Sequence, residues 1–298
     1  MKNKTVSWKS LLDNFFFYSQ INGKRPKTLL WYKDTLIPFT NAVPLEELNM
    51  YSISKYIASL RERGLKPASI DTHIRAIKVF LKFLYDEGYL EEDISAKIKR
   101  YKIPKSYPNI LNDEQIFNLL KACDKKSWIG FRNYVIILTF LDTGIRLSEL
   151  INLTVNDVNI AKRSILIRDG KGGKDREVYM GKTLVREMAK WLKMRGFYPY
   201  EERVFITKDG YPLKPRYIQK FIQKLGKEAG IKGVRCSPHT LRHTFATNFI
   251  RNGGDVFSLQ KILGHSDIST CMIYVHMGGK QLQEAMMKFS PVDRLERY

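Results

Sequence analysis

The sequence is poor in cysteine and has no long apolar run. Its three cysteines lie far apart, and none of them belongs to a C-x-x-C pair. This usage argues against a disulfide framework and a zinc–cysteine site, and it is typical of a reducing cytoplasm. No apolar run approaches the roughly 20 residues of a membrane span. The start, MKNKTVSWKS, is not followed by the apolar segment of a signal peptide. We therefore expect a cytoplasmic protein that does not enter a membrane.

Acidic residues are scarce relative to basic ones. The 298 residues include 51 Lys and Arg against 30 Asp and Glu, which gives a formal net charge of +21. Such a charge favours a polyanionic partner, either nucleic acid or an acidic membrane surface. The excess runs along the whole chain instead of forming one tail. For this reason we expect a nucleic-acid partner and not merely a basic surface.

The length suits about two domains of roughly 150 residues each. The first hundred residues predict helices, at about 8–21, from about 26 and at 52–63. The clearest helical pattern is in ASIDTHIRAIKVFLKFLYDEG, where apolar residues form one stripe: Ile70, Ile74, Ile77, Leu81 and Leu84. Ser69 is expected to cap this helix, and Gly88 is expected to end it.

Three cations of the same helix, Arg75, Lys78 and Lys82, lie on a different face from the apolar stripe. They could simply be part of a solvated helix surface. In a chain this basic we expect them to contact DNA phosphates.

A basic segment with prolines, KRYKIPKSYPNIL, shows no period and predicts a linker at 103–110. It separates a helical domain at 1–102 from a second domain at 111–298. In the second domain, SILIRDGKGGKDREVYM predicts a β-hairpin, and RVFIT is a candidate for another strand. The expected fold class is mainly α with a small antiparallel sheet, or α+β.

The stretch PHTLRHTFAT places His239, Arg242 and His243 on one side of a helix. Ser237 is expected to cap this helix, with proline at its first position. A metal site of the H-E-x-x-H type would need a glutamate where Thr240 stands, and a charged arginine beside a dication is unfavourable. A phosphate fits these side chains better, because arginine offers a fork of donors and histidine a single hydrogen bond.

Four further segments contain a cationic residue, a histidine or a tyrosine that bears on the phosphate interpretation. They are TGIRLSEL with Arg146, GKGGK with Lys171, LGHSDI with His265 and STCMIYVH with Tyr274. Together with His239 and Arg242 of HTLR, and in this order, these motifs resemble the tyrosine recombinase family, the phage-integrase and Xer-like site-specific DNA recombinases. Each motif is weak alone, but the ordered set is specific. The resemblance covers most of the chain, and the N-terminal helical part looks like the core-binding domain of the family.

The resemblance implies that Tyr274 attacks a DNA phosphate and forms a 3′-phosphotyrosine, so that strands can be rejoined without ATP. Arg146 and Arg242 would bind the non-bridging oxygens, and Lys171 would protonate the leaving 5′-oxygen. Lys174 in the same turn is a rival for the role of Lys171. The basic groups take the place of a metal, so we expect neither a metal nor another cofactor.

Other residues have supporting roles in this interpretation. His239 and His265 would supply hydrogen bonds and assist proton transfer at the tyrosine. Glu149 would orient basic partners, with a structural salt bridge within its helix as the alternative. Lys174 and Arg176 are expected to contact DNA phosphates. His243 is expected to face the interior or a neighbouring residue and stays outside the catalytic set.

The C-terminal segment MGGKQLQEAMMKFSP predicts a short amphipathic helix at about 280–289. In the family such a helix docks on a neighbouring protomer, which implies a homotetramer on two copies of a specific core site in double-stranded DNA. The alternative is a helix that packs on its own domain. The resemblance thus implies a nucleoid-associated recombinase that acts in integration, excision or dimer resolution.

Three other functions compete with recombination. A type IB topoisomerase-like enzyme would have a similar pocket and tyrosine, but it would act on any supercoiled DNA. A non-catalytic DNA-binding protein would never become covalently attached to DNA. A metal-dependent hydrolase using His239 and His243 would lose activity with a chelator.

Overall fold

The computed structural model describes residues 7–101, 108–168, 175–198, 200–264 and 267–275. The chain divides into two compact units, Met1–Ser106 and Tyr107–Tyr298, and the division falls within the predicted linker. The described part consists of helices and one small antiparallel sheet, so the predicted fold class is confirmed. None of the helices described is long and apolar enough to cross a membrane.

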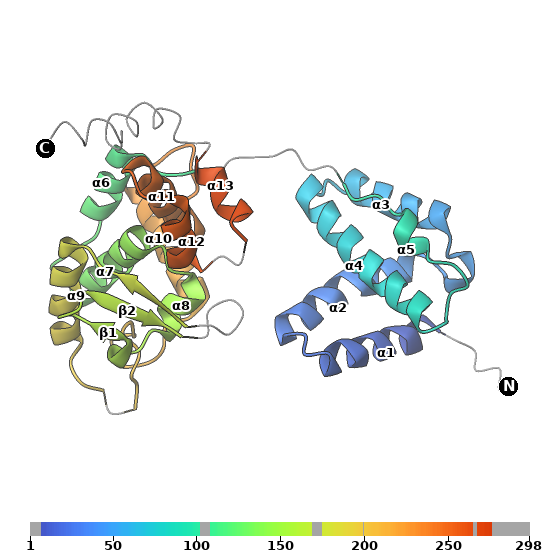
Figure 1. Cartoon of the computed structure of the whole chain (residues 1–298), viewed down its shortest axis with the longest axis horizontal. Helices are drawn as coiled ribbons and strands as arrows, with labels where there is room; N and C mark the ends of the chain where they lie inside the picture. The colour runs from blue at the N-terminus through green and yellow to red at the C-terminus, as the bar shows by residue number, and fades with distance from the viewer. Residues whose placement is uncertain (1–6, 102–107, 169–174, 199, 265–266, 276–298) are drawn as a thin grey trace, which may run out of the picture. The chain divides into compact units, whose positions relative to one another are not determined.

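The first unit is helical (Figure 1). Its elements are α1 (Trp8–Ile21), α2 (Pro26–Ala42), the 3-10 helix η1 (Leu45–Glu47), α3 (Met50–Glu62), α4 (Pro67–Asp86) and α5 (Ile94–Lys97). Helix α4 packs against each of the four α-helices around it because the predicted apolar stripe is buried: Ile70, Ile74, Ile77, Leu81 and Leu84.

The start of α4 differs from the prediction. Ser69 does not cap the helix, which already begins at Pro67 after Lys66, and no side chain provides a cap. Proline at the first helical position has a suitable φ and lacks an N–H that would need a partner, so the helix can begin there. At the other end Gly88 has a φ of 74° and follows the last helical turn, as predicted.

The cations of α4 have partners within their own unit. The Lys78 Nζ donates to the carbonyl oxygens of Ser95 at 2.7 Å and Ile98 at 2.6 Å, and so ties α5 to α4. This internal role replaces the phosphate contact expected of Lys78, because α5 covers that part of the helix. Arg75 and Lys82 are about half exposed and form ion pairs with acidic residues of the same unit.

The second unit surrounds helix α7 (Trp128–Thr143), which is buried along most of its length. Helices α9 (Lys182–Arg195) and α11 (Pro238–Arg251) pack against it (Figure 1). The remaining elements are α6 (Asp113–Lys121), α8 (Leu147–Asn152), η2 (Val155–Asp157), α10 (Pro215–Glu228), α12 (Val256–Leu263) and α13 (Ser269–Val275).

The sheet has three strands in the order β1–β2–β3, all antiparallel. The predicted hairpin is formed by β2 (Ser164–Ile167) and β3 (Arg176–Tyr179), with Ser164 opposite Tyr179. The strand added to this hairpin is β1 (Val158–Asn159), which pairs with β2, and not RVFIT. RVFIT makes only isolated bridges, from Arg203 to Thr154 and from Ile206 to Pro212. Proline has no N–H to donate to a ladder, so pairing does not extend from that bridge.

Candidate active site

The C-terminal end of α12 holds three arginine side chains. Arg176 donates from Nε to the carbonyl of Ile262 at 2.7 Å. Arg242 donates from Nη2 to Leu263 at 2.8 Å, and Arg146 donates from Nη2 to Gly264 at 3.0 Å. The last carbonyls of a helix lack partners within the helix and carry negative partial charge. The end of α12 therefore brings together three cations from three other elements.

Arg146 owes its place to a sharp turn between α7 and α8. Gly144 ends α7 in the left-handed conformation, with a φ of 61°. A Cβ at Gly144 would lie 2.3 Å from Cδ1 of Phe245, so glycine is needed for space as well as for conformation. Arg146 then becomes the N-cap residue of α8. The carbonyl of Gly144 itself accepts from Nη1 of Arg242. One turn of the chain thus positions both arginines.

Glu149 lies between two of these arginines. One carboxylate oxygen accepts from Arg146 Nη1 at 2.7 Å and from Arg176 Nη1 at 2.9 Å. The other accepts from the Arg146 backbone N–H at 2.7 Å and from Arg176 Nη2 at 2.8 Å. Burial raises the pKa of Glu149, but the hydrogen bonds from Arg176 and Arg146 outweigh it and lower the pKa to about 2. Glu149 is thus a carboxylate that fixes the direction of both guanidinium groups.

Arg176 does not have the exposed position expected of a DNA phosphate contact. Its side chain is 11% exposed, and its donors are directed to Glu149 and the Ile262 carbonyl. The reason is that β3 packs against α12. A Cβ at Gly264 would lie 3.2 Å from the Arg176 side chain, so the two residues are in close contact. We therefore correct the prediction: Arg176 holds Glu149 and α12 in place.

Arg242 is the most deeply buried of the predicted site residues in α11. Only 6% of the residue is exposed. Burial lowers the pKa of its guanidinium to about 10, and the charge of Arg146 acts in the same direction. The group therefore still carries its charge at neutral pH. Ser237 caps α11 by accepting from the Thr240 N–H, as predicted, and Pro238 is the first helical residue.

His239 is exposed in the first turn of α11, in contrast to its neighbours in the motif. His243 lies one turn further along and is partly buried. Burial lowers the pKa of His243, and the nearby His239 and Arg242 lower it further. His243 is thus kept neutral at physiological pH.

Tyr274 in α13 lies against this part of α11. It is 3% exposed and belongs to an apolar cluster with residues of α11 and α12. Its hydroxyl is 2.7 Å from Nδ1 of His243, and the two rings are 5.9 Å apart. Burial raises the pKa of Tyr274, and the charge of Arg242 partly opposes this. We expected His243 to face the interior or a neighbouring residue, and the neighbour that it contacts is Tyr274.

Three of the predicted residues, Lys171, Lys174 and His265, lie outside the described residues, as does the segment 280–289. The structure therefore describes Arg146, His239, Arg242 and Tyr274 of the expected catalytic set. Around them it places Glu149, Arg176 and His243.

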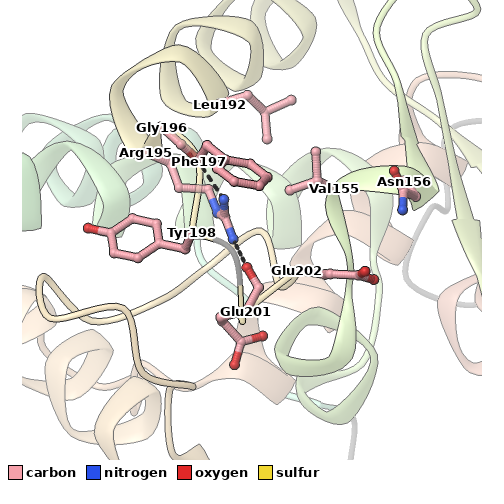
Figure 2. Close-up of a pocket in the computed structure, with 9 residues that line it drawn as sticks. All are labelled: Val155, Asn156, Leu192, Arg195, Gly196, Phe197, Tyr198, Glu201 and Glu202. Carbon is pink, nitrogen blue, oxygen red and sulfur yellow. Dashed lines mark hydrogen bonds between the residues drawn. The ribbon is translucent and has the colours of Figure 1, made fainter.

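A separate pocket is formed at the end of α9 (Figure 2). Its lining comes from that helix end, from 196–198 and 201–202, and from Val155 and Asn156. Arg195 donates to the carbonyls of Gly196, Glu201 and Arg203, and so holds the surrounding loop together. None of the predicted site residues lines this pocket.

Comparison with known proteins identifies the family of this chain. Residues 109–280 match the model of the phage integrase family. The chain belongs to this family. Tyrosine recombinase XerA of Pyrococcus furiosus is 33% identical over 99% of both chains. Tyrosine recombinase XerD of Listeria innocua is 31% identical over 87% of this chain and 88% of its own.

Solved structures of the family have the same fold. The crystal structure of XerA recombinase matches with a TM-score of 0.54 and 28% identity, over 95% of this chain and 99% of that chain. XerH site-specific recombinase bound to its difH substrate matches with a TM-score of 0.66 and 27% identity, over 81% and 70%. A lambda integrase dimer bound to a core site, at 17% identity over 89% and 97%, matches with a TM-score of 0.75. The protein is a tyrosine recombinase, an enzyme that cleaves and rejoins DNA strands in site-specific recombination.

Proposed function

We propose that Tyr274 is the nucleophile of this recombinase. Its Oη forms a bond to the scissile phosphorus, the bond from phosphorus to the 5′-oxygen breaks, and a 3′-phosphotyrosine and a 5′-hydroxyl result. The phosphodiester energy is kept in the new linkage, so rejoining needs no ATP. The proposal is based on the position of Tyr274, which contacts His243. His243 directly follows Arg242, and the guanidinium groups of Arg242 and Arg146 are both bound to the end of α12.

Arg146 and Arg242 bind the two non-bridging oxygens of the phosphate in this proposal. Negative charge builds up on these oxygens in the pentacoordinate transition state, and cations that are already in position stabilise it without reorganisation. Support comes from the fixed geometry of the two groups: Glu149 and Gly264 hold Arg146, while Gly144 and Leu263 hold Arg242. The residual exposure of the Arg146 side chain, 22%, leaves it accessible to a substrate.

The family resemblance assigns three further roles. Lys171 protonates the leaving 5′-oxygen, with Lys174 as a phosphate contact in the same turn. His239 and His265 supply hydrogen bonds and assist proton transfer at the tyrosine. The exposed position of His239 in the first turn of α11 is compatible with a bound phosphate, because a helix N-terminus also favours anions.

We propose that the substrate is double-stranded DNA with a specific core site, in the nucleoid of the cytoplasm. The first unit would be the core-type DNA-binding domain, with the half-exposed Arg75 and Lys82 as phosphate contacts. XerH, which is 27% identical, was crystallised on its difH substrate. The segment 280–289 would exchange between protomers in a homotetramer on two sites. A lambda integrase tetramer bound to a Holliday junction is a precedent for the tetramer.

A suicide-substrate assay tests the nucleophile. Nicked duplexes with randomised sequence are incubated with the protein in excess EDTA, and covalent adducts are recovered on a denaturing gel and sequenced. The expected result is an adduct with the native protein and none with Tyr274→Phe. An adduct that persists in Tyr274→Phe overturns the assignment. Adducts on every sequence without preference would indicate topoisomerase-like action in place of site-specific cleavage.

A further inference from the structure

His243 and Tyr274 form a hydrogen bond between two helices that are distant in the sequence. Nδ1 of His243 lies 2.7 Å from Oη of Tyr274, within the normal range for such a bond. A neutral imidazole carries a proton on one nitrogen and a lone pair on the other. The phenol has one proton, which it must lose when its oxygen becomes the nucleophile. The contact therefore joins the group that must release a proton to a group that can accept one.

The surroundings favour this direction of transfer. Tyr274 is 3% exposed, so water has little access to its hydroxyl. Burial raises the pKa of Tyr274, so the phenol does not ionise by itself at neutral pH and needs a base. Burial lowers the pKa of His243, and His239 and Arg242 on the same helix lower it further, so the imidazole is neutral before the reaction. From α13, the group facing His243 is the Tyr274 hydroxyl itself.

We propose that His243 is the base that takes the proton of Tyr274 during strand cleavage. This inference rests on the assignment of Tyr274 as the nucleophile. The proton moves from Oη to Nδ1 while the bond from Oη to phosphorus forms and the bond from phosphorus to the 5′-oxygen breaks. The 5′-oxygen takes its proton from a separate acid. In rejoining, the imidazolium returns its proton to Oη as the tyrosine leaves.

The charges around His243 also favour return of the proton to Tyr274 during rejoining. The imidazolium formed in cleavage lies beside the positive charge of Arg242 and close to His239. Like charges destabilise the protonated imidazole, which makes it a stronger acid. The same environment that keeps His243 neutral before cleavage thus favours return of the proton in rejoining. A reversible reaction needs both properties in one residue.

His243 could instead only hold the tyrosine ring in place, and two substitutions separate these roles. His243→Asn places an amide oxygen near the position of Nδ1, so it can accept a hydrogen bond, but it cannot take a proton. His243→Phe fills the space and does neither. Both are measured in single-turnover cleavage of the suicide duplex recovered with the native protein. Thermal unfolding and DNA affinity are measured in parallel.

If His243 is the base, His243→Asn slows cleavage by about 100-fold, in line with the usual contribution of general base catalysis. Its DNA affinity stays at the native level, and His243→Phe is at least as slow. A cleavage rate of His243→Asn within about threefold of the native rate would overturn the proposal, since proton transfer contributes far more than that.

A fluorinated tyrosine at position 274 provides the decisive comparison, because its phenol loses its proton more easily. It is introduced into the native protein and into His243→Asn. If His243 is the base, the fluorinated residue speeds cleavage by His243→Asn by at least about tenfold and changes the native rate much less. An equal effect in both backgrounds would mean that His243 only positions the ring. The proposed function fails separately, if Tyr274→Phe still forms an adduct.

A measurement on the native protein covers the case in which the variants do not fold. Nitrogen-15 NMR of labelled histidine reports which ring nitrogen carries the proton, with assignment by comparison to Tyr274→Phe. The proposal requires that Nδ1 of His243 is unprotonated at neutral pH and that its signal shifts when the Tyr274 hydroxyl is removed. A proton on Nδ1 would overturn it, since that nitrogen would then be the donor.

Discussion

Arg146 and Arg242 are bound to adjacent carbonyls of one helix end, those of Gly264 and Leu263. The two arginines come from segments almost a hundred residues apart, and α12 fixes their spacing. The positions of both guanidinium groups therefore depend on one short helix. Exact placement of donors is what electrostatic stabilisation of a transition state requires. The geometry around α12 is therefore expected to determine the cleavage rate more than the DNA affinity.

The first prediction concerns Arg146→Lys. An arginine bonds Glu149 and Gly264 through two separate nitrogens of a planar fork, whereas the donors of lysine all lie on one terminal nitrogen and do not reproduce this geometry. Cleavage of a suicide duplex is expected to fall by about 100-fold or more, in line with the loss of one preorganised donor. DNA affinity, measured by fluorescence anisotropy, should stay almost unchanged. Arg186→Lys is the matched control, because the Arg186 side chain is 65% exposed on α9, and it should cleave at the native rate.

The second prediction concerns the dependence of stability on pH. The pKa of Glu149 is lowered from 4.5 to about 2 in the folded protein. A lowered pKa means that the carboxylate stabilises the fold fully above about pH 4.5, and that this contribution is lost as the pH falls toward about 2. The difference corresponds to about 3 kcal/mol in the free energy of unfolding.

Glu149→Gln removes this contribution, so its stability should be lower than that of the native protein at pH 7 and similar to it near pH 2. Calorimetric unfolding across this range provides the measurement, with the exposed Glu228→Gln as the control. A constant difference between Glu149→Gln and the native protein at all pH values would contradict the prediction.

Most of the helices, and the motifs that carry the candidate site residues, were accessible from the sequence because they depend on local patterns. The apolar stripe of α4 and the Ser237 cap of α11 are such patterns. Helix α9 was not predicted, although Leu184, Met188 and Trp191 have helical spacing and are all buried. The sequence therefore carries the signal of this helix.

Other features could not be predicted because they depend on packing between distant segments. His243 and Tyr274 are 31 residues apart, and their contact exists only because α13 packs on α11. Arg176 follows a basic turn and so looks like a DNA contact in the sequence. Its burial against Glu149 results from the packing of β3 on α12. RVFIT has a strand-like composition, but its central residues Val204, Phe205 and Ile206 are buried without a continuous partner strand.

The third prediction separates two reasons for the glycine at position 144. Gly144 has a φ of 61°, and a Cβ there would also lie 2.3 Å from Phe245. Gly230 has a similar φ of 69°, but a Cβ at that position would meet nothing within 4 Å. Gly230→Ala should therefore cost about 1 kcal/mol from backbone strain alone. Gly144→Ala should cost a further 1–3 kcal/mol, roughly, because overpacking is added. Urea unfolding of both variants measures the difference, and equal costs would show that Phe245 moves aside freely.

The fourth prediction contrasts two lysines of α4, one internal and one half exposed. Lys78 donates to Ser95 and Ile98, so Lys78→Ala leaves two carbonyls without their charged donor. Its free energy of unfolding should fall by about 2 kcal/mol. Lys82 is paired with the partly exposed Asp86 and Asp93 and lies over the ring of Tyr85, all near the surface of the unit. Lys82→Ala should leave the unfolding temperature nearly unchanged.

Replacement of these lysines should affect DNA binding in the opposite order, with a larger effect for Lys82→Ala than for Lys78→Ala. If Lys82 contacts a phosphate, Lys82→Ala weakens binding to all sequences alike. It also reduces the slope of log affinity against log salt concentration by about 1. Lys78→Ala, assayed well below its unfolding temperature, should keep the native slope, because Lys78 is occupied within its own unit. Titrations at several salt concentrations provide the comparison. An altered slope for Lys78→Ala with a native slope for Lys82→Ala would restore Lys78 as the DNA contact and remove Lys82.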